Sequence, residues 1–256
     1  MNRPVVLVTG SARRIGREIA LHLGARGWDV AVHYRQSAAE AQAVVGQLQS
    51  AGARAAAFAT DLADEAACRA LLPAVAGHFG RVDAVVNNAS LFEYDDAAGF
   101  GHQAMERHRR ANTAPAVLLA QALHAHLQGG GRTGCVVNLG DQKTVNPNPD
   151  YFSYTLSKAA LDMATVLLAQ ALAPLVRVCG VAPGVTLVSG PMNDDELQAA
   201  RRLTPLQRSS TPDDIAAAVR FVLESPAVTG TTLLVDGGQH LAAQRRDVLF
   251  LDSGSR

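Results

Sequence analysis

The stretch VVLVTGSARRIG, Val5 to Gly16, decides the fold of this 256-residue chain. Its four valine and leucine residues, Val5–Val8, predict a buried strand. Gly10 and Gly16 follow within one turn, and a helical apolar pattern begins near Ile15. Glycines in such a turn let the backbone approach a pyrophosphate closely, and the amino end of the helix favours its negative charge. The stretch therefore predicts a dinucleotide site beside the first strand.

Continuous apolar runs alternate with helical patterns along the rest of the chain, as in strands that are buried on both faces. The expected strands are Val5–Val8, Asp29–Tyr34, Arg54–Ala59, Val82–Val86, Gly134–Leu139, Arg177–Val181 and Thr231–Val235. The expected helices include Ile15–Arg26, Ser37–Ala51, Glu65–Phe79, Met105–Leu127 and Tyr151–Leu172. This alternation predicts an α/β fold with a single Rossmann-like, doubly wound parallel sheet of about seven strands and helices on both faces. No Pro/Ser-rich linker divides the chain, so we expect one domain, residues 1–256.

Composition excludes several classes of function. The formal net charge is zero and no basic run stands out, which argues against a nucleic-acid surface. The three cysteines and eight histidines have no metal-ligand spacing, and so sparse a cysteine count is typical of a reducing cytosol. The chain enters a strand almost at once, and no apolar stretch reaches the length of a membrane span. We expect a cytoplasmic protein with a small-molecule substrate, without nucleic-acid, membrane or metal partners.

Tyr154 and Lys158 lie four residues apart in the run YTLSK. On a helix both side chains project from one face, one turn apart. A neighbouring ammonium favours the phenolate, so we expect Lys158 to lower the pKa of Tyr154 and the pair to act in acid–base chemistry. Together with a dinucleotide site, the pair indicates hydride transfer coupled to proton transfer.

The residues after the second strand, HYRQSAAEA, bear on the choice of cofactor. An acidic residue at that position would bind the 2′-hydroxyl of NAD and repel a 2′-phosphate. Arg35 and Ser37 stand there instead, and the first carboxylate, Glu40, falls in the next helix. We therefore expect NADP, with Tyr34, Arg35 and Ser37 near its ribose. Ser37 is also expected to cap that helix.

Other polar residues near the strand ends are candidates for cofactor contacts, and some of them have a structural interpretation as well. Arg13 and Arg14 can bind phosphate through their guanidinium groups. Asp61 follows the third strand and either contacts adenine or shapes its own turn. Asn87 and Asn88 end the fourth strand, where buried amides need hydrogen-bond partners, so a structural and a cofactor role are both open.

Three further features stay open in the same way. Asn112 is either an exposed helix residue or marks a helix locally opened around water. Asp141 follows the fifth strand, where a lone aspartate usually forms a turn. Residues 185–207, between the sixth and seventh strands, form either a substrate lid or an ordinary surface excursion.

The motifs TGSARRIG, NNAS, YTLSK and VAPGV occur in an order that resembles the short-chain dehydrogenase/reductase family, over nearly all residues from Val5 to Leu241. The resemblance implies a proton relay of Asn112, Tyr154 and Lys158, and a homotetramer built on the two long helices. The cofactor residues expected from the turn, the strand ends and the resemblance are Gly10, Arg13, Arg14, Ile15, Gly16, Tyr34, Arg35, Ser37, Asp61, Leu62, Asn88, Ala89, Ser90, Lys158, Pro183 and Gly184.

Two departures from the general family pattern narrow the resemblance. Asp141 stands where the family usually has serine, and Arg14 where it usually has glycine. With NNASLF and HYRQSAAEA, they resemble the pteridine reductases and related bacterial dihydropteridine reductases. The substrate residues that this resemblance implies are Arg14, Ser90, Phe92, Asp141, Tyr154 and Thr186. Phe92 would stack on the pterin ring and Asp141 would support Tyr154 as proton donor. In some relatives the C-terminal tail reaches a neighbouring subunit's site; the tail of this chain, residues 242–256, does not match that sequence and receives no role.

The chemistry of a pterin fits these residues. Reduction of a ring C=N bond needs a hydride at carbon and a proton at nitrogen, which a tyrosine can give. A carboxylate at position 141 would repel the alkoxide that develops on a ketone, where a neutral serine would not. The sequence therefore predicts NADPH-dependent reduction of a dihydropterin or dihydrofolate to the tetrahydro form. The alternatives are a carbonyl or 3-oxoacyl reductase and a non-catalytic NADP-binding sensor.

Overall fold

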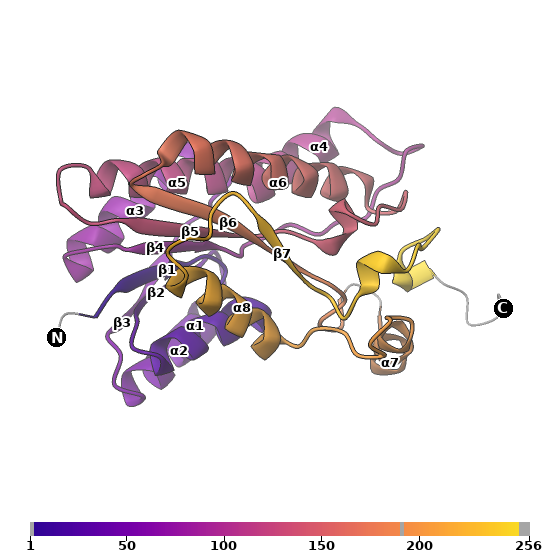
Figure 1. Cartoon of the computed structure of the whole chain (residues 1–256), viewed down its shortest axis with the longest axis horizontal. Coiled ribbons are helices and arrows are strands. Elements are labelled where there is room, and N and C mark those ends of the chain that lie inside the picture. The colour runs from indigo at the N-terminus through magenta and orange to yellow at the C-terminus, as the bar shows by residue number, and fades with distance from the viewer. Residues whose placement is uncertain (1–2, 190–191, 251–256) are drawn as a thin grey trace.

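The computed structural model describes residues 3–189 and 192–250, and its centre is one parallel sheet (Figure 1). The seven strands are β1 Val5–Val8, β2 Asp29–Tyr34, β3 Ala55–Ala59, β4 Ala84–Asn87, β5 Gly134–Leu139, β6 Val176–Pro183 and β7 Thr232–Val235. Their order is β3-β2-β1-β4-β5-β6-β7, and every neighbouring pair is parallel. The predicted doubly wound fold is confirmed.

β1 lies between β2 and β4, so the chain changes direction across the sheet at this strand. Val6 is in register with Val30 on one side and with Ala84 on the other. The crossovers from β1 lead outwards to β2 and β3, whereas β4 starts the other half of the sheet. Ligands of such sheets bind beyond the carboxyl ends of the strands at this switch point.

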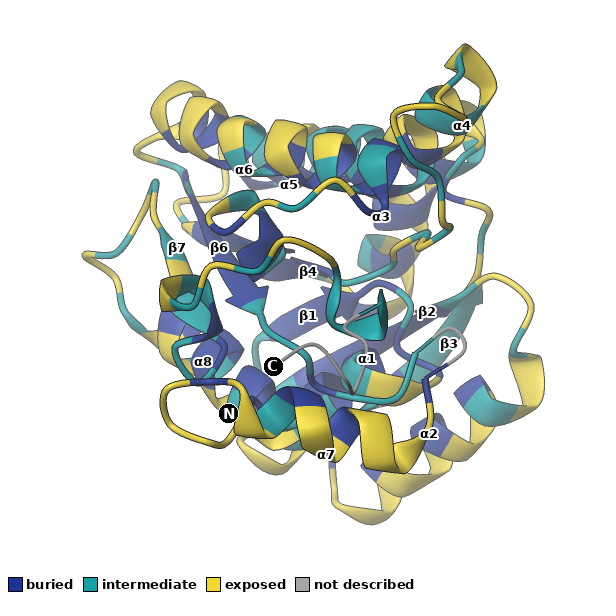
Figure 2. Cartoon of the chain, turned by 90° about the vertical axis from the view of Figure 1, so that its right-hand side faces the viewer, coloured by how far each residue is buried: buried dark blue, intermediate teal, exposed yellow. Residues whose placement is uncertain are grey.

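Helices cover both faces of the sheet (Figures 1 and 2). They are α1 Arg14–Ala25, α2 Ala38–Ser50, α3 Glu65–Phe79, α4 His102–His108, α5 Ala114–Leu127, α6 Phe152–Leu172, α7 Asp194–Arg202 and α8 Pro212–Glu224. α1, α2 and α8 pack on one face, and α3, α5 and α6 on the other. Figure 2 shows the dark, buried strands between helices whose outer sides are exposed.

Each core forms because apolar residues at helical spacing face apolar strands. On α1, Ile19, Ala20 and Leu23 are fully buried, at the i, i+1 and i+4 positions of one stripe. On the opposite face, Leu119 and Leu123 of α5 are also fully buried. Burial of such side chains contributes about 1.5–3 kcal/mol each, so the two helix layers fix the sheet between them.

The long helix expected over Met105–Leu127 is wrong as a single element. α4 begins at His102, and a π-helical turn, Arg109–Thr113, separates it from α5. Asn112 lies in this turn and is only 4% exposed. The interpretation of Asn112 as an exposed helix residue is therefore also wrong. A single inserted residue leaves the apolar pattern on both sides nearly unchanged, and the sequence therefore does not show the break.

Residues 185–207, which the sequence leaves as either a substrate lid or a surface excursion, contain helix α7. Asn193 caps this helix: its side chain accepts a hydrogen bond from the Glu196 amide, and the Glu196 carboxylate accepts one from the Asn193 amide. This reciprocal pair satisfies two free amides at the helix start and stabilises a helix that is otherwise mostly polar. Among the described residues, no helix is both long and apolar enough to cross a bilayer.

Two helical glycines, one crowded and one with free space around it, allow the packing to be tested by substitution. A Cβ at Gly16 would collide with the Gly10 carbonyl oxygen and the Asn88 amide, whereas a Cβ at Gly46 of α2 meets nothing within 4 Å. We expect Gly16→Ala to lower the free energy of unfolding by about 1–3 kcal/mol through overpacking. Gly46→Ala should raise it by roughly 0.5–1 kcal/mol, because alanine favours an exposed helix interior. Urea titrations of both variants check this, and equal effects of the two substitutions would contradict it.

Candidate active site

A cavity of about 810 Å³ lies beyond the carboxyl ends of the strands, at the switch point. Its lining comes from the turn after β1, the ends of β2 to β6, the segment after β6 and the tail after β7. Eighteen of the sequence-predicted site residues line it: Gly10, Arg13, Arg14, Ile15, Gly16, Arg35, Asp61, Leu62, Asn88, Ala89, Ser90, Phe92, Asp141, Tyr154, Lys158, Pro183, Gly184 and Thr186. Tyr34, Ser37 and Asn112 do not line it.

The turn after β1 is locked by hydrogen bonds from neighbouring strands. Gly10 adopts a left-handed conformation (φ 63°), and its amide donates to Nδ1 of His33 at 3.0 Å. The Asn88 side chain donates to the carbonyl oxygens of Thr9 and Gly10. Asn88 thus has the structural role that was one of its two interpretations, and it also lies at the cavity wall.

The glycine turn fits a dinucleotide phosphate. Because Gly10 and Gly16 lack side chains, backbone atoms of the turn lie in close contact at the first residues of α1. A Cβ at Gly10 would lie 3.0 Å from Cα of Ala89, so glycine is needed there for both conformation and space. The N-cap residue of α1, Arg13, has no side-chain acceptor and makes no capping hydrogen bond to the first amides of the helix. These amides are available to an anion.

Three arginines surround this turn. Arg13 forms an exposed ion pair with Glu40, which offsets the first carboxylate after β2. Arg14 donates to the carbonyl oxygen of Val188 at 2.8 Å and so joins the turn to the segment after β6. Arg35 is exposed at the rim of the cavity.

The structure corrects the expected capping role of Ser37 and does not place Tyr34 in the cavity lining. Ser37 occupies the N-cap position of α2 but makes no side-chain capping bond, because its backbone (φ −86°, ψ 61°) is not extended as a capping residue usually is. Tyr34 pairs with Ala59 in the sheet and lies outside the cavity lining. Asp61 does shape its own turn, accepting from the Ala63 amide, and it also lines the cavity.

A buried group of three ionisable side chains lies at the other end of the cavity. The Tyr154 hydroxyl donates to Oδ2 of Asp141 at 2.6 Å. Lys158 donates to the carbonyl oxygen of Leu139 at 2.7 Å, and its ammonium lies 5.7 Å from the centre of the Tyr154 ring. The spacing in YTLSK therefore places both side chains on one buried face of α6, as expected. Asp141 reaches them from the end of β5.

Burial shifts the pKa values of all three groups. It raises the pKa of Tyr154 well above 10, and the negative charge and hydrogen bond of Asp141 raise it further. Burial lowers the pKa of Lys158 to about 8, against the attraction of Asp141. Burial also raises the pKa of Asp141. The expectation that Lys158 lowers the pKa of Tyr154 is therefore wrong here, because desolvation and Asp141 outweigh the ammonium. Tyr154 keeps its proton at neutral pH.

Asn112 acts on the backbone in this structure. Its Oδ1 accepts from the Leu91 amide at 2.6 Å, and its Nδ2 donates to the Leu91 carbonyl oxygen and to Oγ of Ser157. It therefore fixes the segment after β4 against α6. Its membership of a proton relay with Tyr154 and Lys158 stays a prediction.

Aromatic side chains line the substrate end. Phe92 stacks on Tyr151, with ring centres 4.1 Å apart and 13° between the planes, and meets Tyr154 edge-on at 4.7 Å. Tyr151 holds one face of the Phe92 ring, yet Phe92 remains 37% exposed and lines the cavity. Thr186 is buried nearby, where its hydroxyl bonds to the Gly184 carbonyl oxygen and the Ser210 hydroxyl.

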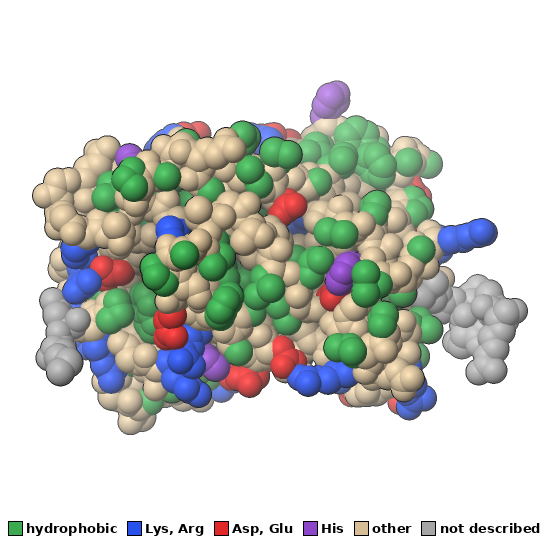
Figure 3. Space-filling model, in the orientation of Figure 1, with side chains coloured by type: hydrophobic (Ala, Val, Ile, Leu, Met, Phe, Trp, Pro, Cys, Tyr) green, Lys and Arg blue, Asp and Glu red, His purple; other side chains and the backbone are tan. Residues whose placement is uncertain are grey.

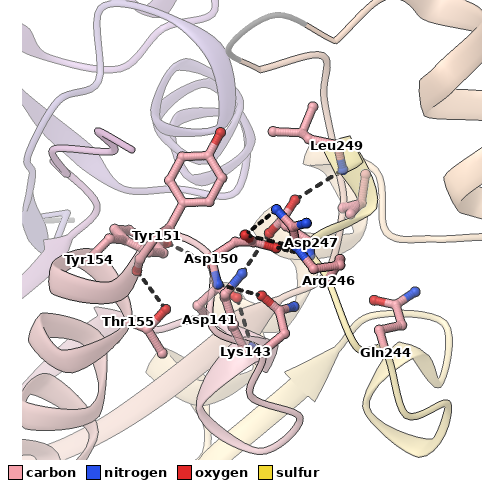
Figure 4. A network of polar contacts seen from close by, with 12 residues as sticks. Asp141, Lys143, Asp150, Tyr151, Tyr154, Thr155, Gln244, Arg246, Asp247 and Leu249 are labelled. Atoms are coloured by element: carbon pink, nitrogen blue, oxygen red, sulfur yellow. Dashed lines mark hydrogen bonds and ion pairs between the residues drawn. The ribbon is translucent and has the colours of Figure 1, made fainter. Parts of the chain in front are cut away.

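Several lining residues were missed in the sequence. His33 and Thr60 support the turn after β1, and Lys143 follows Asp141. The tail, which received no role, contributes Gln244, Asp247, Val248 and Leu249 to the lining. Figure 4 shows how Arg246 and Asp247 of the tail meet the loop after β5. No local motif marks the tail residues, because their contacts with the loop after β5 join segments about a hundred positions apart.

The family model described as short chain dehydrogenase matches residues 4–199. The chain belongs to this short-chain dehydrogenase family. The predicted resemblance is confirmed, and the protein is a short-chain oxidoreductase whose Tyr154 and Lys158 occupy the buried face described above.

Individual members of the family, among them proteins of known structure, are similar to this chain over nearly its whole length. A structure of FolM alternative dihydrofolate reductase 1 from Brucella suis, in complex with NADP, is 38% identical, covers 95% of this chain and 97% of its own, and superposes with a TM-score of 0.90. Pteridine reductase 1 of Leishmania tarentolae is 32% identical over 93% of this chain and 96% of its own. The granaticin polyketide synthase putative ketoacyl reductase 2 of Streptomyces violaceoruber is 33% identical, over 93% and 96%.

His33 makes stability depend on pH. Its Nδ1 accepts from Gly10 and its Nε2 lies 3.1 Å from the Thr60 carbonyl oxygen, so the neutral ring is required. Burial lowers its pKa from 6.5 to about 4. Between these values the unfolded chain binds a proton that the folded chain does not. This contribution to stability is therefore complete above pH 6.5 and declines by up to about 3 kcal/mol towards pH 4.

Urea unfolding between pH 4 and 7.5 measures this slope. His33→Gln keeps an acceptor and a donor without titrating, and should flatten the slope in this range. The exposed His102→Gln is the control and should leave the slope unchanged. A His33→Gln variant with the wild-type slope would contradict the assignment.

Proposed function

We propose that this short-chain oxidoreductase is an NADPH-dependent pteridine reductase, which reduces a dihydropterin or dihydrofolate to the tetrahydro form. The observation that carries the proposal is the hydrogen bond from Tyr154 to Asp141, 2.6 Å long, in a cavity that Phe92 and Arg14 also line. A tyrosine paired with an acid suits protonation of a ring nitrogen. The FolM and pteridine reductase relatives support the same substrate class.

NADP suits the cofactor end of the cavity. The glycine turn and the amino end of α1 would hold the pyrophosphate, and Lys158 would hold the nicotinamide ribose. Arg35 at the rim would meet a 2′-phosphate, and the ion pair between Arg13 and Glu40 removes the repulsion of the nearby carboxylate. When bound, the reduced nicotinamide supplies a hydride.

The residues of the chain supply the proton. Tyr154 keeps its proton at neutral pH and points its hydroxyl at Asp141. Once a substrate nitrogen gains basicity, Tyr154 donates this proton to it, and Asp141 holds the hydroxyl in position. Asp141, whose raised pKa favours protonation, can then take a proton from solvent in the cavity and pass it to the Tyr154 phenolate, which restores the hydroxyl. Lys158 beside the ring stabilises the transient phenolate.

The walls of the substrate end suit a flat, polar ring. Phe92, held by Tyr151, offers an aromatic surface, and such stacking contributes about 0.5–1.5 kcal/mol beyond area burial. Arg14 stands between the phosphate turn and the segment after β6, within reach of both ends of the cavity. A small ketone needs neither side chain. The similarity to a putative ketoacyl reductase supports the alternative function, that of a carbonyl reductase.

The homotetramer stays a prediction, and exposed apolar side chains fit it. Leu156, Met163 and Leu167 of α6 are 41%, 59% and 57% exposed. Apolar side chains also gather over β7 and α8 on the face shown in Figure 3. Phe221 of α8 is 56% exposed and Leu233 of β7 is 38% exposed. We propose that both surfaces are covered by further copies of this chain. The cytoplasmic location also stays a prediction.

Cofactor preference tests the rim of the cavity. We expect the wild type to prefer NADPH over NADH, and Arg35→Ala to raise the Michaelis constant for NADPH about tenfold, the loss of one charge-assisted hydrogen bond. The Michaelis constant for NADH should scarcely change. Arg26→Ala, an exposed arginine at the opposite end of α1, is the matched control. Equal use of both cofactors by the wild type would disprove the preference.

Substitutions at the acid–base pair test the substrate class. Tyr154→Phe should lower turnover of dihydrobiopterin by at least about 10²-fold while NADPH still binds, because the ring stays and the proton is lost. Asp141→Ser should lower pterin turnover and leave or raise reduction of simple ketones, because the carboxylate that repels an alkoxide is gone. NADPH oxidation with dihydropterins, dihydrofolate, ketones and an acyl thioester gives both results.

Each alternative predicts its own pattern in that assay. Fast reduction of ketones or thioesters with no pterin turnover would replace the proposal by a carbonyl reductase. Tight NADPH binding without turnover of any substrate would indicate the non-catalytic sensor.

A further inference from the structure

The tail after β7 contributes to the lining of the cavity of its own chain, with Gln244, Asp247, Val248 and Leu249. Figure 4 shows Arg246 and Asp247 beside the loop that carries Asp141. The tail leaves a short turn, Gln239–Leu241, where the Asn146 side chain donates to the carbonyl oxygens of Gln239 and Ala242. It then runs along the loop after β5 and ends, within the described residues, in a second turn, Val248–Phe250. We name Gln244–Phe250 the tail segment.

Two ion pairs fasten the tail segment to the loop that carries Asp141. Arg246 binds the carboxylate of Asp150 with both Nε and Nη2, at 2.8 Å, and the Asp247 amide donates to the same carboxylate at 2.7 Å. Lys143 donates to Oδ2 of Asp247 at 2.7 Å. The Lys143 side chain is only 4% exposed and that of Asp247 15%, so neither charge can be left alone at low cost.

The Lys143–Asp247 pair lies directly against the catalytic group. The backbone amide of Lys143 donates to Oδ1 of Asp141 at 2.8 Å, while Oδ2 of Asp141 accepts from Tyr154. The tail thus holds the residue whose amide orients the Asp141 carboxylate.

Aromatic contacts connect the tail segment to the substrate wall. Phe250 packs edge-on against Tyr94 at 5.3 Å and lies 6.3 Å from Tyr151. Tyr151 in turn stacks on Phe92. Tyr151 holds a left-handed backbone (φ 56°), which is uncommon for an aromatic residue.

From these contacts we infer that the tail segment is a specificity-determining wall, which limits the substrate end to compact rings and excludes long substituents. Asp247, Val248 and Leu249 line the cavity beside the loop that carries Asp141, to which Asp247 is joined through Lys143. The wall is supplied by the same chain and is fixed by two ion pairs, so a substituent can extend there only if the segment is displaced. This inference rests on the proposed function, and it specifies which pteridines the cavity accepts.

The experiment compares a compact and an extended substrate. Dihydrobiopterin has a short side chain, and dihydrofolate carries a benzoyl-glutamate extension. The specificity ratio is kcat/KM for dihydrobiopterin divided by kcat/KM for dihydrofolate, measured with saturating NADPH. The variants are a chain ending at Ala243, Asp247→Asn and Leu249→Ala, and the control is Arg245→Ala, an exposed neighbour within the tail segment.

We expect the shortened chain to lower the specificity ratio at least roughly tenfold, through a lower KM for dihydrofolate and a higher KM for dihydrobiopterin. Leu249→Ala and Asp247→Asn should shift the ratio in the same direction by about threefold or more. Arg245→Ala should keep the wild-type ratio. NADPH affinity, measured by titration, should stay within about twofold in all variants, because the phosphate turn lies outside the tail segment.

A ratio that stays constant in the shortened chain and in Leu249→Ala, with pterin turnover intact, would overturn this inference and leave the proposed function standing. A wild type that reduces neither pteridine would overturn both. If the shortened chain fails to bind NADPH, the two point variants decide the question by the same ratio.

Discussion

The close approach of β1 and β4 at their carboxyl ends is the constraint on which the site depends. At this point Asn88 binds the carbonyl oxygens of Thr9 and Gly10, and the start of α1 passes so close that Gly16 has no room for a side chain. These contacts place the first residues of α1, whose amides receive no side-chain cap, at the cavity wall. Because all seven strands are parallel, their carboxyl ends meet at the same edge. Asp141, Tyr154 and Lys158 therefore lie at the other end of the cavity that begins at the glycine turn.

Arg14 adopts an unfavourable backbone conformation in the site. It begins α1 with φ 54°, a left-handed conformation that costs a non-glycine residue roughly 1–2 kcal/mol. Glycine, which the family usually has at this position, would adopt it freely. The arginine side chain offsets this by binding the Val188 carbonyl oxygen. The phosphate turn and the segment after β6 are thus joined by a side chain that also faces the cavity.

Much of the fold was predictable from the sequence, since buried parallel strands appear as apolar runs and the bounds agree within two residues at each end, as for Val82–Val86 against β4. The pair Tyr154 and Lys158 was predictable because helical spacing is local. The π-helical turn was not, because one inserted residue hardly changes the apolar pattern around Asn112. The pKa of Tyr154 was misjudged because its sign depends on burial and on Asp141, which only the folded chain brings to 2.6 Å.

The tail could not be predicted for a related reason. Lys143 and Asp247 are 104 positions apart, and as single charges in the sequence both resemble solvated surface residues. Only the fold shows that the pair is enclosed and that the Lys143 amide orients Asp141. The glycine turn, which in our proposal holds the cofactor, is encoded by a local motif. The walls that we propose select the substrate come from the loop after β5, the segment after β6 and the tail, which meet only in space. On this proposal, substrate specificity depends on long-range contacts and can change while the cofactor site remains the same.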